Sequence, residues 1–242
     1  MEHFLTSAIR RYYQLEVPSA TGPSATGQDK RWPLLIALHG YEGNKDSMMA
    51  VARAVGGSNM VVISLQGPHQ FFIERGRNDP TQRRNYTVGF GWGTSYKMEE
   101  AVELHHENIR ELISLAVRRF HADRQKVFLM AFSQACSYNY RFVFTYPRTI
   151  LGVISVCGGV PGDWETNLRY QAARTHVLHI AATHDEWYTR EKNVEFKRML
   201  ARRAASVDFR FYRSPHKFPR RSIPRIRTWI AKIMALNAEG KP

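Results

Sequence analysis

Residues 126–135, Lys-Val-Phe-Leu-Met-Ala-Phe-Ser-Gln-Ala, contain a transition from which the architecture can be worked out. The apolar run Lys126–Phe132 is typical of a strand that is buried on both faces. A helix is expected from about Gln134 to Tyr146, because Pro147 cannot continue it. Ser133 therefore stands in a sharp turn between a buried strand and a helix.

The same alternation of strands and helices extends in both directions along the chain. Further strands are expected at Tyr12–Val17, Pro33–Leu38, Met60–Leu65, Gly152–Cys157, His176–Ala182 and Val207–Tyr212. Further helices are expected at about 46–55, with Asp46 as the N-cap, and at about 97–120, 190–204 and 222–236. Strand–helix–strand units place neighbouring strands in parallel. We therefore expect residues 1–242 to form a single α/β domain with a mostly parallel central sheet, helices on both faces and Tyr12–Val17 at an edge.

Two segments lack this periodicity. Residues 18–27 repeat Pro-Ser-Ala-Thr-Gly once, and the small, polar stretch 19–29 is expected to be a flexible loop. Residues 68–96 are rich in Arg, Asn, Gly and aromatic side chains and are expected to form a long loop. Long loops in compact domains are often functional, so we place residues 68–96 near the mouth of the active site.

The composition is that of an ordinary globular protein except for its charge. Apolar residues make up 43% and charged residues 23%, which excludes a disordered chain, and no apolar run approaches the roughly 18 residues of a membrane span. Lys and Arg number 35 against 21 Asp and Glu, giving a net charge of +14, and 26 of the cations are Arg. These arginines form short scattered clusters rather than a basic helix or an aromatic stacking platform, so a nucleic-acid partner is not expected.

The cysteines and the N-terminus bear on the compartment. Cys136 and Cys157 are too few for a disulfide framework and do not form a metal-ligand pair. Met1–Arg11 lacks the apolar core of roughly 7–15 residues that a secretory signal needs. We therefore expect a cytoplasmic protein with reduced thiols and no metal site.

Three chemically complementary residues follow strands of the predicted sheet. In open α/β sheets, ligands bind at the carboxyl ends of the strands. Ser133, Asp185 and His216 each follow a strand, and the order hydroxyl, acid, imidazole is the order expected of a nucleophile on a strand-to-helix turn. Asp163 also follows a strand and is the alternative acid. His216 is the only histidine after the last predicted strand.

The surroundings of Ser133 suit a nucleophile. A serine on such a strained turn needs small residues two positions before and after it, and Ala131 and Ala135 are small. An anion that develops in the reaction needs two N–H donors. The backbone of Gln134 is one candidate, and the backbone of Tyr41, in the loop after strand Pro33–Leu38, is the other.

These motifs resemble the phospholipase/carboxylesterase group of α/β-hydrolases, which includes acyl-protein thioesterase-like esterases. The matching pieces are Leu38-His39-Gly40, Phe132-Ser133-Gln134, Cys157-Gly158-Gly159, Thr183-His184-Asp185 and His216-Lys217-Phe218-Pro219. The resemblance implies an α/β-hydrolase fold with Ser133 as nucleophile, His216 as base and Asp185 as acid, and with Tyr41 and Gln134 as the oxyanion hole. The chain differs from the family pattern at Ala131 and Ala135, where the family has glycines. It also differs at Ser214-Pro215, where the family often has Gly-Gly.

The sequence therefore predicts a serine hydrolase that cleaves small-molecule carboxylic esters or thioesters through an acyl-enzyme, without a metal or organic cofactor. Candidate pocket residues are His39, Gly40, Phe90, Trp92 and Trp187. The missing elbow glycines support the alternative, a weak or inactive hydrolase-fold binding protein. A further hypothesis is that arginines in the long loop favour anionic esters or an anionic surface, namely Arg75, Arg77, Arg83 and Arg84.

Overall fold

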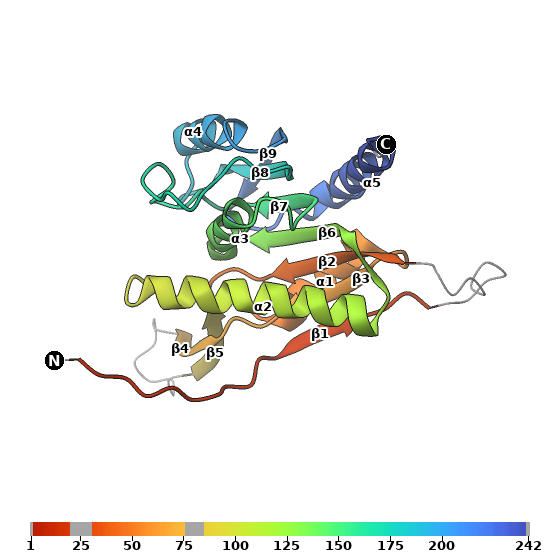
Figure 1. Cartoon of the computed structure of the whole chain (residues 1–242). Helices are drawn as coiled ribbons and strands as arrows, with labels where there is room; N and C mark the ends of the chain where they lie inside the picture. Colours follow the sequence, from red (N-terminus) through yellow and green to blue (C-terminus); the bar gives the residue numbers. More distant parts are fainter. Residues whose placement is uncertain (1, 20–30, 76–84, 241–242) are drawn as a thin grey trace.

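A central sheet of seven strands organises the computed structural model, which describes residues 2–19, 31–75 and 85–240. The strand order is β1-β3-β2-β6-β7-β8-β9, in which β1 pairs antiparallel with β3 and the other neighbours pair in parallel (Figure 1). The strands are β1 (Tyr13–Glu16), β2 (Trp32–Leu38), β3 (Val61–Leu65), β6 (Ala122–Phe132), β7 (Gly152–Val156), β8 (His176–His184) and β9 (Ser206–Pro215). This confirms the predicted mostly parallel α/β sheet, with its first strand at an edge.

Within the described residues, five helices cover the two faces of the sheet. They are α1 (Lys45–Gly56), α2 (Met98–Arg119), α3 (Gln134–Thr145), α4 (Arg190–Ala201) and α5 (Ile223–Glu239), with a short 3-10 turn at Arg220–Ser222. Alternate residues of the strands form two cores, because successive strand side chains point to opposite faces. Leu34 and Ile36 pack with α2 and α3, whereas Leu35 packs with α1 and α5.

The first helix begins two residues earlier than expected. Asn44, not Asp46, is its N-cap: Asn44 has an extended backbone (φ −148°), and its side chain accepts a hydrogen bond from the Ser47 N–H at 2.8 Å. Because a cap residue must be non-helical while the next residues are helical, Asp46 lies inside the first turn. There its negative charge favours the positive end of the helix dipole.

The segment 68–96 is not an irregular loop throughout, and that expectation was wrong. It contains an antiparallel pair, β4 (His69–Arg75) and β5 (Asn85–Gly91), separate from the main sheet. Tyr86, Val88 and Phe90 alternate along β5 and therefore share one face. Gly89 lies opposite Phe71 on the other face, where a Cβ would come 2.5 Å from Ile73 Cδ1.

Two other expectations concern residues that the structure does not describe. The predicted flexible loop 19–29 lies outside the described residues except for its first position. Of the four arginines invoked for anionic esters, Arg77, Arg83 and Arg84 lie outside the described residues, and Arg75 ends β4.

Candidate active site

The turn at Ser133 is strained in the manner that the sequence pattern predicts. Ser133 lies between β6 and α3 with φ 53° and ψ −119°, which a non-glycine residue rarely adopts. The turn is held from both sides: the Ser133 N–H donates to the Val156 carbonyl at 2.9 Å, and the Cys136 N–H donates to the Ser133 carbonyl at 3.0 Å. The serine hydroxyl is thereby presented at the carboxyl end of the sheet.

Ser133, His216 and Asp185 form a continuous hydrogen-bonded relay. His216 Nε2 lies 2.8 Å from Ser133 Oγ, and His216 Nδ1 lies 2.9 Å from Asp185 Oδ2. Because a carboxylate only accepts, Nδ1 carries the proton and Nε2 is free to accept the serine proton. The three residues follow β6, β8 and β9, so three separate strand ends bring them together.

Asp185 is fixed by its own neighbours. Its Oδ1 accepts hydrogen bonds from the N–H groups of Trp187 at 3.0 Å and Tyr188 at 2.9 Å, and only 7% of the residue is exposed. The alternative acid, Asp163, instead pairs with Arg141 on α3 at 2.7 Å. Of the two carboxylates, Asp185 is therefore the one that is hydrogen-bonded to the imidazole of His216.

Gly40 brings the loop after β2 against Ser133. A Cβ at Gly40 would lie 2.7 Å from Phe132 Cδ1 and 3.1 Å from Ser133 Cβ, so only glycine fits there. The loop then turns back, with the Gly43 N–H donating to the Gly40 carbonyl at 3.0 Å. Tyr41 lies within this turn, adjacent to Gly40.

His39 and Trp92 stabilise that loop through hydrogen bonds. His39 Nδ1 lies 2.7 Å from the Gly40 carbonyl, and Nε2 accepts from the Gly67 N–H at 2.9 Å. Burial lowers the pKa of His39, so the ring is neutral with its proton on Nδ1. Trp92 Nε1 donates to the His39 carbonyl at 2.8 Å. Both side chains are at most 2% exposed, so they support the loop rather than form the pocket wall that the sequence suggested.

Gln134 joins α3, the helix after Ser133, to the end of β5. Its Oε1 accepts from the Trp92 N–H at 3.0 Å, and its Nε2 donates to the Gly93 carbonyl at 2.8 Å. The Gln134 side chain therefore connects the elbow to the Trp92 segment, and Trp92 connects that segment to the loop of Tyr41. The two backbones predicted to form an oxyanion hole belong to one bonded network.

The predicted oxyanion-hole residue Tyr41 and the predicted pocket residues Trp187 and Phe90 lie nearer the surface. Tyr41 is 55% exposed and stacks on Phe71 of β4, with ring centroids 4.7 Å apart. Trp187 is 66% exposed next to Asp185, and Phe90 is half-buried on β5.

Two aromatic neighbours of the site were missed from the sequence. Phe71 falls in the segment that the sequence predicts to be a loop, and its close packing against Gly89 is visible only in the structure. Tyr188, whose ring centroid is 5.9 Å from that of His216, carries no sequence signal beyond its position three residues after Asp185.

Gly158 packs closely against the elbow, whose two alanines lie in the core. Ala131 and Ala135 are both fully buried within the packed core. A Cβ at Gly158 would lie 2.4 Å from Cys136 Sγ and 2.6 Å from the Ser133 carbonyl oxygen. Position 158, two residues after the end of β7, must therefore be glycine if the elbow is to keep its position.

The sheet order and the strained strand-to-helix turn at Ser133 define an α/β-hydrolase fold. Residues 25–234 match the model of the Phospholipase/Carboxylesterase family, and the chain belongs to that family. The match supports a hydrolase of the carboxylesterase or phospholipase type. No curated protein sequence matches the chain at a significant level.

Solved structures share the fold at low sequence identity. The Bacillus cereus carboxylesterase is 17% identical over 92% of this chain and 94% of that one, with a TM-score of 0.69. Arabidopsis thaliana SOBER1 is 18% identical over 84% and 99%, and a carboxylesterase from Mesorhizobium loti is 15% identical over 84% and 90%; both have a TM-score of 0.66. Within the described residues, no helix is both long and apolar enough to span a bilayer.

Proposed function

We propose that the chain hydrolyses carboxylic esters or thioesters through an acyl-enzyme formed on Ser133. The observation that carries the proposal is the relay Ser133–His216–Asp185, with contacts of 2.8 and 2.9 Å, on a strained turn. A structural serine in a strand-to-helix turn does not require a histidine whose other nitrogen is held by a buried carboxylate. Such an arrangement suits proton transfer from a hydroxyl.

The reaction follows from the positions of the protons. His216 Nε2 removes the Ser133 proton as the serine oxygen bonds to the acyl carbon, and the negative charge moves to the carbonyl oxygen. The N–H groups of Tyr41 and Gln134 stabilise that oxyanion. When the carbon–oxygen or carbon–sulfur bond breaks, the alcohol or thiol leaves with the proton from His216.

Deacylation repeats the sequence with water. His216 removes a proton from a water molecule, the hydroxide oxygen attacks the acyl carbon, and Ser133 leaves with the proton that His216 returns. Asp185 keeps the imidazole in the Nδ1–H tautomer and stabilises the imidazolium in both halves of the reaction. The products are a carboxylic acid and the alcohol or thiol.

A panel of p-nitrophenyl esters and acyl thioesters of increasing chain length tests the proposal, together with a fluorophosphonate probe. We expect the probe to label Ser133 and the panel to be cleaved by the native chain but not by Ser133→Ala. Ester hydrolysis that persists in Ser133→Ala, or a probe that labels neither protein, contradicts the proposal. The relative rates of hydrolysis of esters and thioesters show whether an alcohol or a thiol is the preferred leaving group.

A second candidate function is binding without turnover, and Ala131 and Ala135 favour it because the family elbow has glycine at both positions. Restoring the family residues in the double variant Ala131→Gly/Ala135→Gly distinguishes the two. If hydrolysis is absent in the native chain and appears in the double variant, the chain is a binding protein that has lost turnover. If the native chain is already active, the alanines are compatible with catalysis.

A further inference from the structure

A second cleft lies at the end of the sheet opposite Ser133. Its lining comes from the starts of β6 and β8, the residues before β7 and the last turns of α5. In Figure 1 the arrowheads of β2 and β6 point to the left, toward the site, whereas α5 runs to the C-terminus at the right. The volume of this cleft is about 760 Å³, within the range of roughly 300–1,000 Å³ that holds small ligands.

Three arginines line this cleft, and no acidic residue does among the described residues. Arg124, Arg148 and Arg174 come from three different segments and are all exposed. None of them forms an ion pair with another described residue. Asp123, the neighbour of Arg124, is already paired with Lys126 at 3.1 Å.

The segments that carry these arginines are fixed relative to one another. The Arg174 N–H donates to the Pro147 carbonyl at 3.2 Å, which ties the segment before β8 to the segment of Arg148. The N–H of His176, which also lines the cleft, donates to the Leu151 carbonyl at 3.0 Å. The backbones that carry Arg148 and Arg174 are therefore tied together before any ligand binds.

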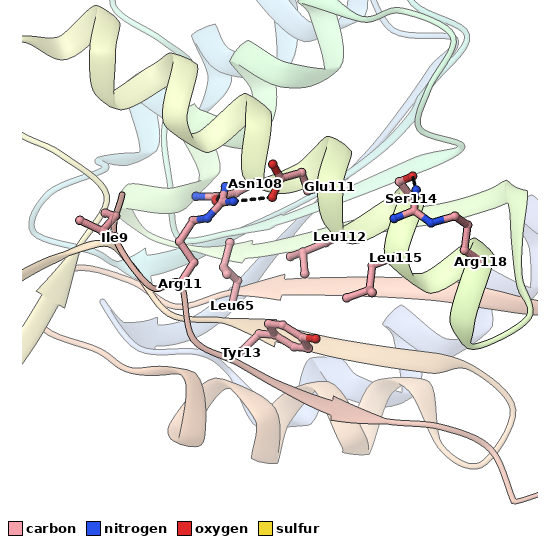
Figure 2. Close-up of a pocket in the computed structure, with 10 residues that line it drawn as sticks. All are labelled: Ile9, Arg11, Tyr13, Leu65, Asn108, Glu111, Leu112, Ser114, Leu115 and Arg118. Atoms are coloured by element: carbon pink, nitrogen blue, oxygen red, sulfur yellow. Dashed lines mark hydrogen bonds and ion pairs between the residues drawn. The ribbon is translucent and has the colours of Figure 1, made fainter. Parts of the chain in front are cut away.

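A different cleft, between β1 and α2, provides a contrast (Figure 2). There Arg11 donates to Asn108 at 2.7 Å and pairs with Glu111, so an acid of the same cleft neutralises its charge. The cleft at the amino ends of the strands has no such compensation among the described residues. Its charge is available to an external anion.

Attraction to helix ends does not account for the whole cluster. Helices α2, α3 and α5 end near this side, and a helix C-terminus carries about half a negative charge that favours cations. Only one helix end of the described chain, that of α5, lines the cleft. Its half negative charge does not account for three full positive charges there. Leu151 and Leu236 add apolar surface beside them.

We propose that this cleft binds a small organic polyphosphate, with Arg124, Arg148 and Arg174 on the phosphates and Leu151 and Leu236 against the apolar part. Guanidinium groups match phosphate oxygens in charge and in bidentate geometry. A nucleoside triphosphate has the required combination of clustered negative charge and an apolar ring. The proposal is independent of ester hydrolysis, because the cleft and Ser133 lie at opposite ends of the strands.

Titration calorimetry with ATP, tripolyphosphate and adenosine tests this inference. We expect ATP to bind at concentrations up to about 1 mM, tripolyphosphate to bind more weakly and adenosine not to bind. The triple variant Arg124→Gln/Arg148→Gln/Arg174→Gln is expected to weaken ATP binding by about 30-fold or more, since charge-assisted hydrogen bonds are lost. The single variant Arg174→Gln, a smaller change, is expected to weaken it by a lesser factor.

A matched variant with the same loss of charge is Arg10→Gln/Arg198→Gln/Arg227→Gln, which removes exposed arginines elsewhere. It should keep ATP affinity within about threefold. Equal losses in both triple variants mean that only the overall field attracts ATP, and they overturn the proposal. The proposal is also overturned if ATP does not bind, or if a single-stranded oligonucleotide binds much more tightly than ATP. Ser133→Ala should bind ATP normally, which separates this result from the fate of the proposed hydrolysis.

Discussion

At the scale of single residues, the candidate site depends on where protons are held. The Asp185 carboxylate accepts three hydrogen bonds, one from His216 and two from backbone N–H groups. An amide in its place would be free to present an N–H to His216 Nδ1. The imidazole would then protonate at Nε2 and could no longer accept the Ser133 proton.

We therefore expect Asp185→Asn to lower kcat for ester hydrolysis by about 10³- to 10⁴-fold, with little change in KM. Steady-state kinetics on the preferred p-nitrophenyl ester, with thermal unfolding to check the fold, measure this effect. Glu186→Gln is a control, because Glu186 is an exposed neighbour whose carboxylate forms no hydrogen bond or ion pair with His216 among the described residues. Equal kcat values for the two variants contradict the assigned role of Asp185.

Steric limits around the elbow give a second residue-scale prediction. We expect Gly158→Ala to lower the free energy of unfolding by about 2–3 kcal/mol, because its Cβ would overlap Cys136 and the Ser133 carbonyl. Gly162→Ala is the matched control, since a Cβ there has no atom within 4 Å. Urea unfolding measures both. A Gly158→Ala protein as stable as the control means that the elbow is not packed as described.

At the scale of elements, three connections act together: the loop after β2, the end of β5 and the start of α3. Gln134 joins α3 to Trp92 and Gly93, and Trp92 joins β5 to His39. The positions of the Tyr41 and Gln134 N–H groups therefore depend on a hairpin that lies outside the main sheet. Any displacement of that hairpin would alter the spacing of the two donors.

Gln134→Met keeps the side-chain length but removes both hydrogen bonds. We expect it to lower kcat about tenfold and to slow fluorophosphonate labelling, with a smaller change in KM, because each lost bond is worth about 1 kcal/mol. Ser137→Ala, in the same helix, removes only a bond to the Gln134 carbonyl and should leave kcat nearly unchanged. If Gln134→Met reduces stability alone and leaves kcat intact, the network is structural and does not position the donors.

Elements were predictable from the sequence where their periodicity was long and regular. The α2 helix runs from Met98 to Arg119, close to the expected 97–120, because its apolar positions recur at helical spacing. The hairpin β4–β5 was missed although Tyr86, Val88 and Phe90 alternate along β5, because Gly89 and Gly91 between and after them are of a type depleted in strands. Those glycines are required by close packing against Ile73 and Gln134, which a local pattern does not reveal.

At the scale of the whole molecule, buried histidines make the fold sensitive to acid. Burial lowers the pKa of His105 and His106 to about 3 each and of His179 to about 4, with the charge of His106 acting further on His105 and that of Arg169 on His106. The ordinary value is 6.5. The unfolded chain therefore binds more protons than the folded chain below pH 6.5, and stability falls as the pH falls through this range.

At pH 5 these three histidines together should reduce the free energy of unfolding by about 6 kcal/mol relative to pH 7.5, about 2 kcal/mol each. This is comparable to the total stability of an ordinary domain, so we expect acid unfolding near pH 5. Urea midpoints between pH 7.5 and 5 measure the slope. His106→Phe should reduce it by about a third, and a midpoint that does not change with pH contradicts the prediction.

Local pattern was sufficient to predict the alternation of strands and helices and the order of Ser133, Asp185 and His216 along the chain. Side-chain periodicity and turn preferences act over a few residues, so they are readable without the fold. The contact between His216 and Ser133 spans 83 residues, and the burial of His39 and Trp92 also depends on distant segments. The same holds for the arginines of the second cleft, which three segments bring together at the amino ends of the strands. Only the strand order and packing of the folded chain determine such distances, because they arise from contacts between segments that the sequence keeps far apart.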